Sequence, residues 1–344
     1  MSDVMSSSAD ERYSRQILFS PIGASGQLRL SQSVVAIVGC GATGSAVAAL
    51  LARAGVGRLR IIDRDYVEAS NLQRQSLFDE ADARESLPKA LAAARKIAQF
   101  NSAISVQPEV ADLIAENAAP LLGDCHLILD GSDNFDTRYL LNDFAVNHGM
   151  AWIYSAAVGS YCATMNVIPG ETACLACIFP EPPSATETCD TVGILNSAVN
   201  LVASIQASEA IKFLVGARDQ LCRSLLSWDV WSNQRAEVSA DKPRPDCRVC
   251  DAREFAYLEG KARAHTTLLC GRDAVQIHES HRPVDFREMS RKLDPHGRVS
   301  HNEFVLKFWR EPYELTLFPD GRAIIKGTSD AAQARSFYAR FVGA

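Results

Sequence analysis

The sequence predicts an α/β protein whose main part is a doubly wound, mainly parallel, Rossmann-like sheet, followed by a small α+β domain at the C-terminus. The apolar, β-branched run 34–38 ends in glycine, which is typical of a strand buried on both faces of a parallel sheet. An Ala- and Leu-rich helix expected over 43–54 leads to a second strand at 58–62. Strands and helices then alternate up to about residue 160, as doubly wound folds require.

The remaining elements follow in order. A helix is expected over 87–100, with Pro88 in its first turn. Further strands are predicted at 104–106, 126–129, 152–156 and 161–168, and helices at 138–148 and 196–215. The tail has short predicted strands at 275–278, 304–308, 313–318 and 322–326 and a helix at 331–341. The expected domains are an N-terminal arm and helix (1–30), the main domain (31–252) and the small α+β domain (262–344).

Composition narrows the class of protein. The 344 residues are 47% hydrophobic and 22% charged, which is typical of a globular chain and not of a disordered one. A net charge of -6 gives no overall basic field, so we expect no nucleic-acid partner. The sequence contains neither a secretory leader nor an apolar run long enough to span a bilayer, so we expect no membrane contact and a cytoplasmic protein.

A glycine-rich turn follows the first strand. Gly39, Gly41 and Gly44 lie between a strand and a helix. Glycines there let the backbone approach a phosphate, and the helix N-terminus offers free N–H groups to it. Asp63 ends the next strand, 24 positions after Gly39, and could accept hydrogen bonds from ribose hydroxyls. The glycines could instead form only a tight strand-to-helix turn. The matching order of strand, glycines, helix and Asp63 favours nucleotide binding. NAD is the default nucleotide for such a pattern.

The residues after Asp63 favour ATP over NAD. Asp65, Asn71, Arg74 and Gln75 place polar and charged groups just beyond the strand, and an arginine suits a triphosphate. Lys89 begins an Ala-rich helix and could also reach phosphate. Taken singly, Arg74 and Lys89 are better explained as solvated surface charges, and only the combined set favours a triphosphate.

A polar loop after a later strand suggests magnesium. Asp133 and Asn134 follow the buried strand 126–129, at the sheet edge where such folds bind ligands. A carboxylate there can hold Mg2+ against phosphates. Together with the preceding residues, this loop predicts ATP with Mg2+.

Four cysteines form two Cys-x-x-Cys pairs, and the pairs lie 70 positions apart, counted from Cys177 to Cys247. Two pairs of thiolates fit tetrahedral Zn2+, and a set of four leaves no position open for substrate, so the zinc is expected to be structural. Buried free cysteines are the less favoured alternative. The predicted zinc ligands are Cys174, Cys177, Cys247 and Cys250.

A further cysteine, Cys189, lies in a Thr-rich loop outside both pairs. It is the candidate for a nucleophilic thiol that links covalently to a substrate protein. A bystander role is equally open.

These motifs together resemble the ThiF/MoeB/HesA family of adenylyltransferases, which are related to ubiquitin-activating enzymes. The similarity covers about residues 11–251, and the tail is similar to the C-terminal extension of the longer bacterial ThiF proteins. The motifs are Arg12-Tyr-Ser-Arg15-Gln, Gly39-x-Gly-x-x-Gly44, Asn71-Leu-Gln-Arg-Gln75, Asp130-Gly-Ser-Asp-Asn134, the two cysteine pairs and Thr188-Cys-Asp-Thr.

The resemblance implies an enzyme that uses ATP to adenylate the C-terminal Gly-Gly carboxylate of a small ubiquitin-like sulfur carrier. A ThiS-like carrier of thiamine biosynthesis is favoured, and a MoaD-like carrier of molybdopterin biosynthesis is the alternative. A homodimer and a sulfur donor such as a cysteine desulfurase are also implied.

The resemblance also implies roles for individual residues. Gly41, Gly44 and Asp63 would hold the nucleotide, Asp133 the magnesium, and Arg15 would reach the ATP of the partner subunit. Asn71, Arg74 and Lys89 would hold the phosphates. Two remoter alternatives are an NAD-dependent oxidoreductase and a non-catalytic scaffold that binds a ubiquitin-like protein.

Overall fold

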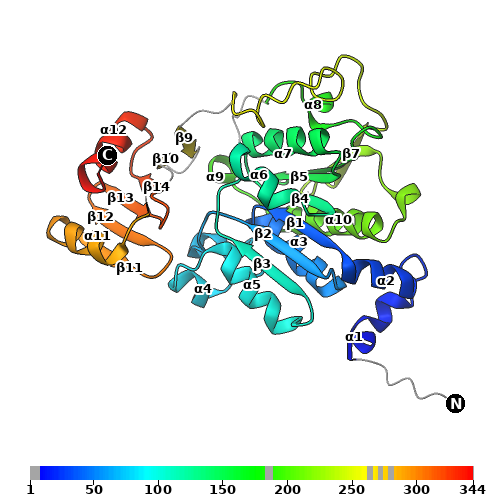
Figure 1. The fold of residues 1–344 in the computed structure, drawn as a ribbon, viewed down its shortest axis with the longest axis horizontal. Helices are drawn as coiled ribbons and strands as arrows, with labels where there is room; N and C mark the ends of the chain where they lie inside the picture. The colour runs from blue at the N-terminus through cyan, green and yellow to red at the C-terminus, as the bar shows by residue number, and fades with distance from the viewer. Residues whose placement is uncertain (1–7, 183–188, 262–265, 270–273, 278–282, 344) are drawn as a thin grey trace. The chain divides into compact units, whose positions relative to one another are not determined.

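The computed structural model describes residues 8–182, 189–261, 266–269, 274–277 and 283–343. The chain divides into two compact units, which are considered separately (Figure 1). Unit 1 contains Met1–Ala185 and Ile194–Ala262, and unit 2 contains Thr186–Gly193 and Arg263–Ala344.

Unit 1 is built on an eight-stranded sheet in the order β3-β2-β1-β4-β5-β6-β7-β8. The parallel part consists of β1 (Val34–Val38), β2 (Arg58–Ile62), β3 (Ser105–Glu109), β4 (Leu127–Asp130) and β5 (Trp152–Val158). The antiparallel part adds β6 (Tyr161–Val167), β7 (Ser224–Asp229) and β8 (Gln234–Ser239). The predicted doubly wound, mainly parallel sheet is confirmed, although β7 and β8 were not anticipated.

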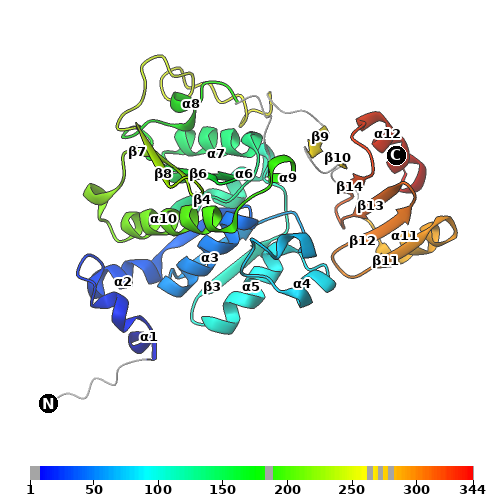
Figure 2. The same ribbon diagram turned by 180° about the vertical axis from the view of Figure 1, so that it is seen from behind.

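Helices cover both faces of this sheet. Figures 1 and 2 show α3 (Ala42–Ala54), α5 (Lys89–Phe100) and α10 (Asn196–Leu214) on one face. The other face carries α6 (Ala115–Leu122) and α7 (Phe135–His148), which pack over the fully buried Trp152. Shorter helical elements are η1 (Ala69–Asn71), α4 (Glu80–Arg84), α8 (Leu175–Ile178), α9 (Cys189–Val192) and η2 (Arg218–Gln220). Among the described residues, no helix has the length and apolarity needed to cross a bilayer.

Two stretches differ from the sequence prediction. The N-terminal region contains two helices, α1 (Ser8–Ile17) and α2 (Gly23–Gln32), where a polar arm with a helix was expected. Helix α5 begins at Lys89, two positions later than expected, because Pro88 forms an isolated bridge with Tyr66 and the Leu87 carbonyl accepts from the Val67 backbone N–H at 2.8 Å. The backbone N–H of Lys89 donates to the Asp65 carbonyl at 2.8 Å. This pairing fixes the start of α5 beside the end of β2.

Unit 2 is a six-stranded antiparallel sheet in the order β11-β12-β13-β14-β10-β9, which agrees with the predicted α+β class. Two helices, α11 (Phe286–Leu293) and α12 (Ala331–Phe341), cover one face, where Phe308, Phe337 and Phe341 form the aromatic centre of the core. The strands are β9 (Thr266–Leu269), β10 (Ala274–Ile277), β11 (Arg298–His301), β12 (Leu306–Arg310), β13 (Tyr313–Leu317) and β14 (Ala323–Lys326), with a short helical turn η3 (Asp294–His296).

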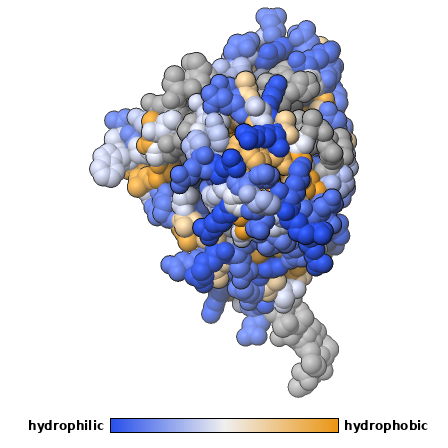
Figure 3. All heavy atoms as spheres, turned by 90° about the vertical axis from the view of Figure 1, so that its left-hand side faces the viewer, coloured by the Kyte–Doolittle hydropathy of each residue, from blue (hydrophilic) through white to orange (hydrophobic). Residues whose placement is uncertain are grey.

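The face of the molecule drawn in Figure 3 is largely hydrophilic, with apolar residues in small separate groups.

Candidate nucleotide and metal sites

The glycine-rich turn between β1 and α3 is packed backbone against backbone. Gly39 adopts a φ of +87°, and a Cβ placed on it would lie 2.6 Å from the Gly131 carbonyl oxygen. A Cβ on Gly44 would lie 1.8 Å from the Gly39 carbonyl oxygen. Gly131, which the sequence analysis had not singled out, meets the same two glycines. These three positions therefore need glycine because the turn and the loop after β4 touch.

Gly41 has a different environment. A Cβ on Gly41 would have its nearest neighbour 3.9 Å away, at Nε2 of Gln75. Among the described residues, no side chain caps α3 at Gly41, so the N–H groups of its first turn remain available. The buried Gln75 has no hydrogen-bond partner for its Oε1 among the described residues. A ligand with both acceptors and donors, such as a nucleotide, would satisfy these groups.

Asp63 lies beneath this turn at the end of β2. Its carboxylate accepts hydrogen bonds from the backbone N–H of Cys40 at 2.5 Å and of Asp65 at 2.7 Å. Burial raises the pKa of Asp63, while nearby Lys89 lowers it and Asp65 raises it. Each carboxylate oxygen keeps a second acceptor site, so Asp63 can still accept from ribose.

Lys89 is not a solvated surface charge. Its side chain is 6% exposed, and its Nζ lies 3.1 Å from Oδ2 of Asp65. Arg74 is half-buried, with Nη1 donating to the Ser70 carbonyl at 2.9 Å. Oδ1 of Asn71 accepts from the Glu68 backbone N–H at 3.1 Å and thereby caps η1. The structure thus gives Asn71 a local structural role and places the Lys89 ammonium beside Asp65, just after the end of β2.

The loop after β4 rests on a buried ion pair. Oδ2 of Asp130 lies 3.1 Å from Nε of Arg138, and both side chains are buried. Burial raises the pKa of Asp130, and Arg138 opposes that shift. A second buried residue, Gln206 of α10, donates from Nε2 to the Asp130 and Ile153 carbonyls at 2.9 and 3.0 Å. Neither Arg138 nor Gln206 was found by sequence reasoning, because both come from helices whose pattern shows only a generic buried face.

Asp133 is exposed at the end of this braced loop. Asn134 follows it as the N-cap of α7, where its Oδ1 accepts from the Thr137 backbone N–H at 2.8 Å. Nδ2 of Asn134 lies 3.4 Å from Oδ1 of Asp133. Asn134 therefore starts the helix and contacts Asp133, whose side chain stays exposed.

A cation that the sequence analysis did not consider also lies at this edge. Nη1 of Arg64 is 3.1 Å from Oδ2 of Asp112, and the two side chains are 20% and 14% exposed. Burial lowers the pKa of Arg64, but Asp112, Asp65, Asp133 and Asp63 together raise it. Arg64 is thus surrounded by carboxylates from the ends of β2, β3 and β4.

The four predicted zinc ligands converge. The sulfurs of Cys174, Cys177, Cys247 and Cys250 all lie within 4.8 Å of one another. The Cys174–Cys177 and Cys174–Cys247 separations are 3.8 and 3.7 Å. Tetrahedral Zn2+ with Zn–S bonds of about 2.3 Å would place its sulfurs about 3.8 Å apart. The backbone N–H of Arg244 donates to Cys177 Sγ at 3.3 Å, which supports a thiolate there.

Comparison with known proteins identifies the family. The model of the ThiF family matches residues 13–249. The chain belongs to the ThiF family. It is 43% identical, over 96% of its length and 99% of the relative's, to a protein of Bacillus subtilis named sulfur carrier protein ThiS adenylyltransferase. It is 36% identical, over 70% of its length and 90% of the relative's, to a sulfur carrier protein adenylyltransferase of Thermus thermophilus.

A solved structure shares the fold of this ThiF-family chain. The crystal structure of E. coli MccB superimposes with a TM-score of 0.62 at 23% identity and covers 71% of this chain and 73% of that one. The ThiF-family match confirms the resemblance drawn from the sequence motifs. The MccB structure shows that the fold is shared.

Arg15 lies on α1, away from the glycine turn of its own ThiF-family chain. Helix α1 is tied to the C-terminal end of α3, where Nε2 of Gln16 donates to the Ala54 carbonyl at 2.8 Å. The glycine turn lies at the other end of α3, and a 13-residue helix is about 20 Å long. Arg15 itself is exposed. The structure thus does not bring Arg15 together with Asp63, Lys89 and Asp133.

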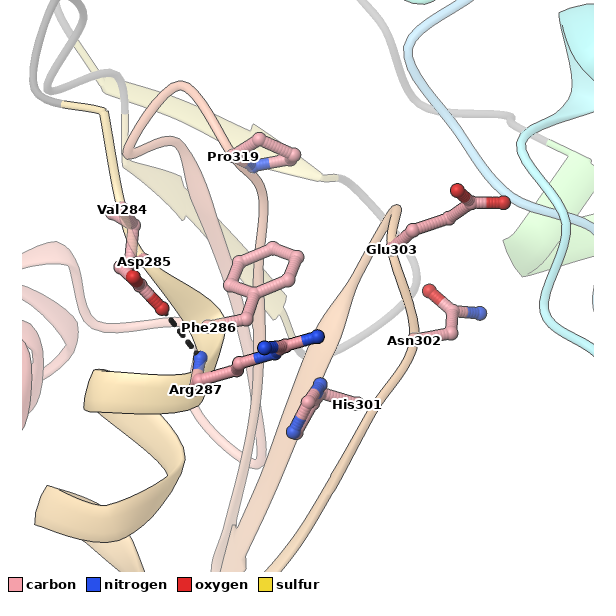
Figure 4. Close-up of a pocket in the computed structure, with 8 residues that line it drawn as sticks. All are labelled: Val284, Asp285, Phe286, Arg287, His301, Asn302, Glu303 and Pro319. Atoms are coloured by element: carbon pink, nitrogen blue, oxygen red, sulfur yellow. Dashed lines mark hydrogen bonds between the residues drawn. The ribbon is translucent and has the colours of Figure 1, made fainter.

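Two features lie in unit 2. Cys189 begins α9, and its side chain falls outside the described residues, so its nucleophilic role stays a prediction. The second feature is an open pocket of about 540 Å³, in which Phe286 lies between Val284 and Arg287 and the guanidinium of Arg287 faces His301 (Figure 4). None of the residues predicted to bind nucleotide or metal lines this pocket.

Proposed function

We propose that this ThiF-family protein is an ATP-dependent adenylyltransferase that activates the C-terminal carboxylate of a ThiS-like sulfur carrier. The observation that carries the proposal is the convergence of Gly41, Asp63, Lys89 and Asp133 at the carboxyl edge of β1, β2 and β4. Ligands bind at this edge in doubly wound folds, beside the point where the strand order reverses. The 43% identity to a ThiS adenylyltransferase over nearly the whole chain supports the choice of carrier.

The reaction needs positioning and neutralised charge more than acid–base chemistry. The carrier carboxylate, which is ionised at neutral pH, attacks the α-phosphorus of ATP. A bond forms between a carboxylate oxygen and that phosphorus, the bond to the bridging oxygen breaks, and pyrophosphate leaves with the electron pair. Both reactants are anions, so Lys89 and Arg74 would lower the barrier by offsetting negative charge on the phosphates.

Asp133 would hold Mg2+, which supplies further positive charge to the triphosphate when bound. Asp63 would fix the ribose, and the first turn of α3 would donate N–H groups to phosphate oxygens. Zinc at the four cysteines would join the segment after β6 to the end of unit 1 without taking part in the chemistry. The proposal includes these residue roles and a homodimer in which Arg15 acts on the partner's ATP. It also includes a cysteine desulfurase as sulfur donor and a cytoplasmic location.

The carrier is the open choice within this proposal. The Thermus thermophilus relative is named for a sulfur carrier protein without one carrier specified, so its name does not decide between the ThiS-like carrier and the MoaD-like alternative. The test is ATP–pyrophosphate exchange with purified ThiS-like and MoaD-like carriers, each compared with a version lacking its final Gly-Gly. We expect exchange with the intact ThiS-like carrier and a mass increase of one AMP. Exchange only with the MoaD-like carrier would reassign the substrate, and none with either would refute adenylation of this carrier class.

A further inference from the structure

We propose that Arg64, held in place by Asp112, contacts the purine base of the bound nucleotide and thereby positions the nucleoside part of that nucleotide. This inference rests on the proposed function, because it assigns a residue to the same nucleotide site. Arg64 follows directly after Asp63, the expected ribose contact, and none of the motifs that identify the family includes it.

The first support is the way Arg64 is held. Its Nη1 is 3.1 Å from Oδ2 of Asp112, and both side chains are largely buried. On another edge of the guanidinium, Nε lies 3.9 Å from Oδ1 of Asp65. Two carboxylates in contact with the edges of a planar group fix its orientation and leave its flat face as the surface for a ligand.

The second support is location. Strand β2 pairs with β3 up to Ile62 and Glu109, and the Asp63 backbone N–H donates to the Glu109 carbonyl at 3.0 Å. Arg64 then bridges from the end of β2 to Asp112 in the segment that follows β3. The glycine turn that suits phosphates lies on the opposite side of β2, after β1. With the ribose at the end of β2 and the phosphates over β1, the base extends toward β3.

The third support is charge. Four aspartates act on the Arg64 guanidinium and raise its pKa, with Asp112 contributing most among them and burial opposing the shift. Its N–H edges are already directed at carboxylates of Asp112 and Asp65, so its plane, more than its hydrogen-bond donors, is left for a ligand. A planar, weakly hydrated guanidinium is well suited to stack on a base.

The test compares ligands that share the base and differ in phosphate number. Dissociation constants for adenosine, AMP and ATP are measured by calorimetry on the full-length wild type and on Arg64→Met, Arg64→Lys and Asp112→Asn proteins. We expect both Arg64 variants to raise the dissociation constants of all three ligands by a common factor of about fivefold or more, since stacking on the base is lost. Arg64→Lys keeps the charge, so it separates loss of the plane from loss of the cation. Asp112→Asn should weaken binding in the same pattern by a smaller factor.

Two other results would overturn the proposal. A loss that grows with phosphate number would place Arg64 at the triphosphate. Unchanged affinities together with a lower melting temperature in all three variants would make the Arg64–Asp112 pair a purely structural brace. A kinetic measurement adds a second criterion: the KM for ATP in carrier-dependent exchange should rise in Arg64→Lys while kcat at saturating ATP is retained. Wild type that fails to bind ATP would refute the proposed function itself, whereas ATP binding unaffected by these variants would refute this inference alone.

Discussion

The Gly39 carbonyl oxygen occupies the space that a side chain on Gly44 would need, only 1.8 Å from the position of a Cβ. This contact closes the turn between β1 and α3, and Gly131 packs against it from the loop after β4. The shape of the sheet's carboxyl edge after β1 and β4 therefore depends on backbone contacts between two loops.

The two kinds of glycine in this turn should respond differently to substitution. Gly44→Ala forces a methyl group into backbone atoms, so we expect a loss of about 1–3 kcal/mol in the free energy of unfolding, as for other overpacked sites. Gly41→Ala has space and should retain wild-type stability while ATP binds more weakly. Denaturant unfolding and ATP calorimetry on the pair provide the measurement. Equal stability of the two variants would contradict the packing described for Gly44.

Asp130 and Asp133 form a second contrasting pair in one loop. Asp133→Asn should abolish carrier adenylation and leave the fold intact, because the side chain is exposed and its proposed partner is Mg2+. Asp130→Asn should instead cost about 3–5 kcal/mol of stability, since it leaves the buried Arg138 charge without its carboxylate. Thermal melting and adenylation assays distinguish the two. Near-normal adenylation by Asp133→Asn at ordinary Mg2+ would disprove its assignment.

Zinc removal should loosen the four-cysteine cluster of unit 1. We expect one zinc per chain by metal analysis, and a lower melting temperature after strong chelation or in Cys247→Ser, because structural zinc contributes directly to folding. Cys222→Ser is the control, since Cys222 lies outside the cluster. Freshly purified protein without zinc would eliminate the metal site.

Arg15 should act across a dimer, because α1 is attached at the far end of α3 from the glycine turn. Arg15→Ala and Asp133→Ala proteins, each inactive alone, should regain activity when mixed and allowed to exchange subunits. Each mixed dimer then contains one site with an intact Asp133 and the Arg15 of its partner. Absence of recovery after exchange has been demonstrated by mass spectrometry would rule out action in trans.

Asp143 on α7 should make stability depend on pH. Burial raises its pKa to about 6, although its carboxylate accepts hydrogen bonds from the Tyr257 and Leu258 backbone N–H groups. The folded chain then holds a proton that the unfolded chain releases near pH 4, so the free energy of unfolding falls as pH rises from about 4 to about 6. Asp143→Asn should flatten this part of the profile. An unchanged slope in the variant would show that other groups cause it.

Much of this protein is determined by local sequence. A β-branched run such as 34–38 specifies a buried strand, and the glycine turn after it specifies the entry into α3, because both depend on residues close together in the chain. The spacing of Cys174 with Cys177 and of Cys247 with Cys250 was sufficient to predict that the four sulfurs converge, since each pair comes from one tight turn. The family motifs then indicated which residues to propose as nucleotide ligands.

Only the tertiary structure decided how distant segments support one another. Sequence separation gives no sign that Arg64 meets Asp112, that Gln206 bonds to the end of β4, or that Gly131 must be glycine. The start of α5 shifted to Lys89 because residues 66 and 88 form a bridge that helix propensity does not anticipate. Such contacts arise when the sheet brings its strand ends to one edge, where burial makes each charge and each backbone group find a partner.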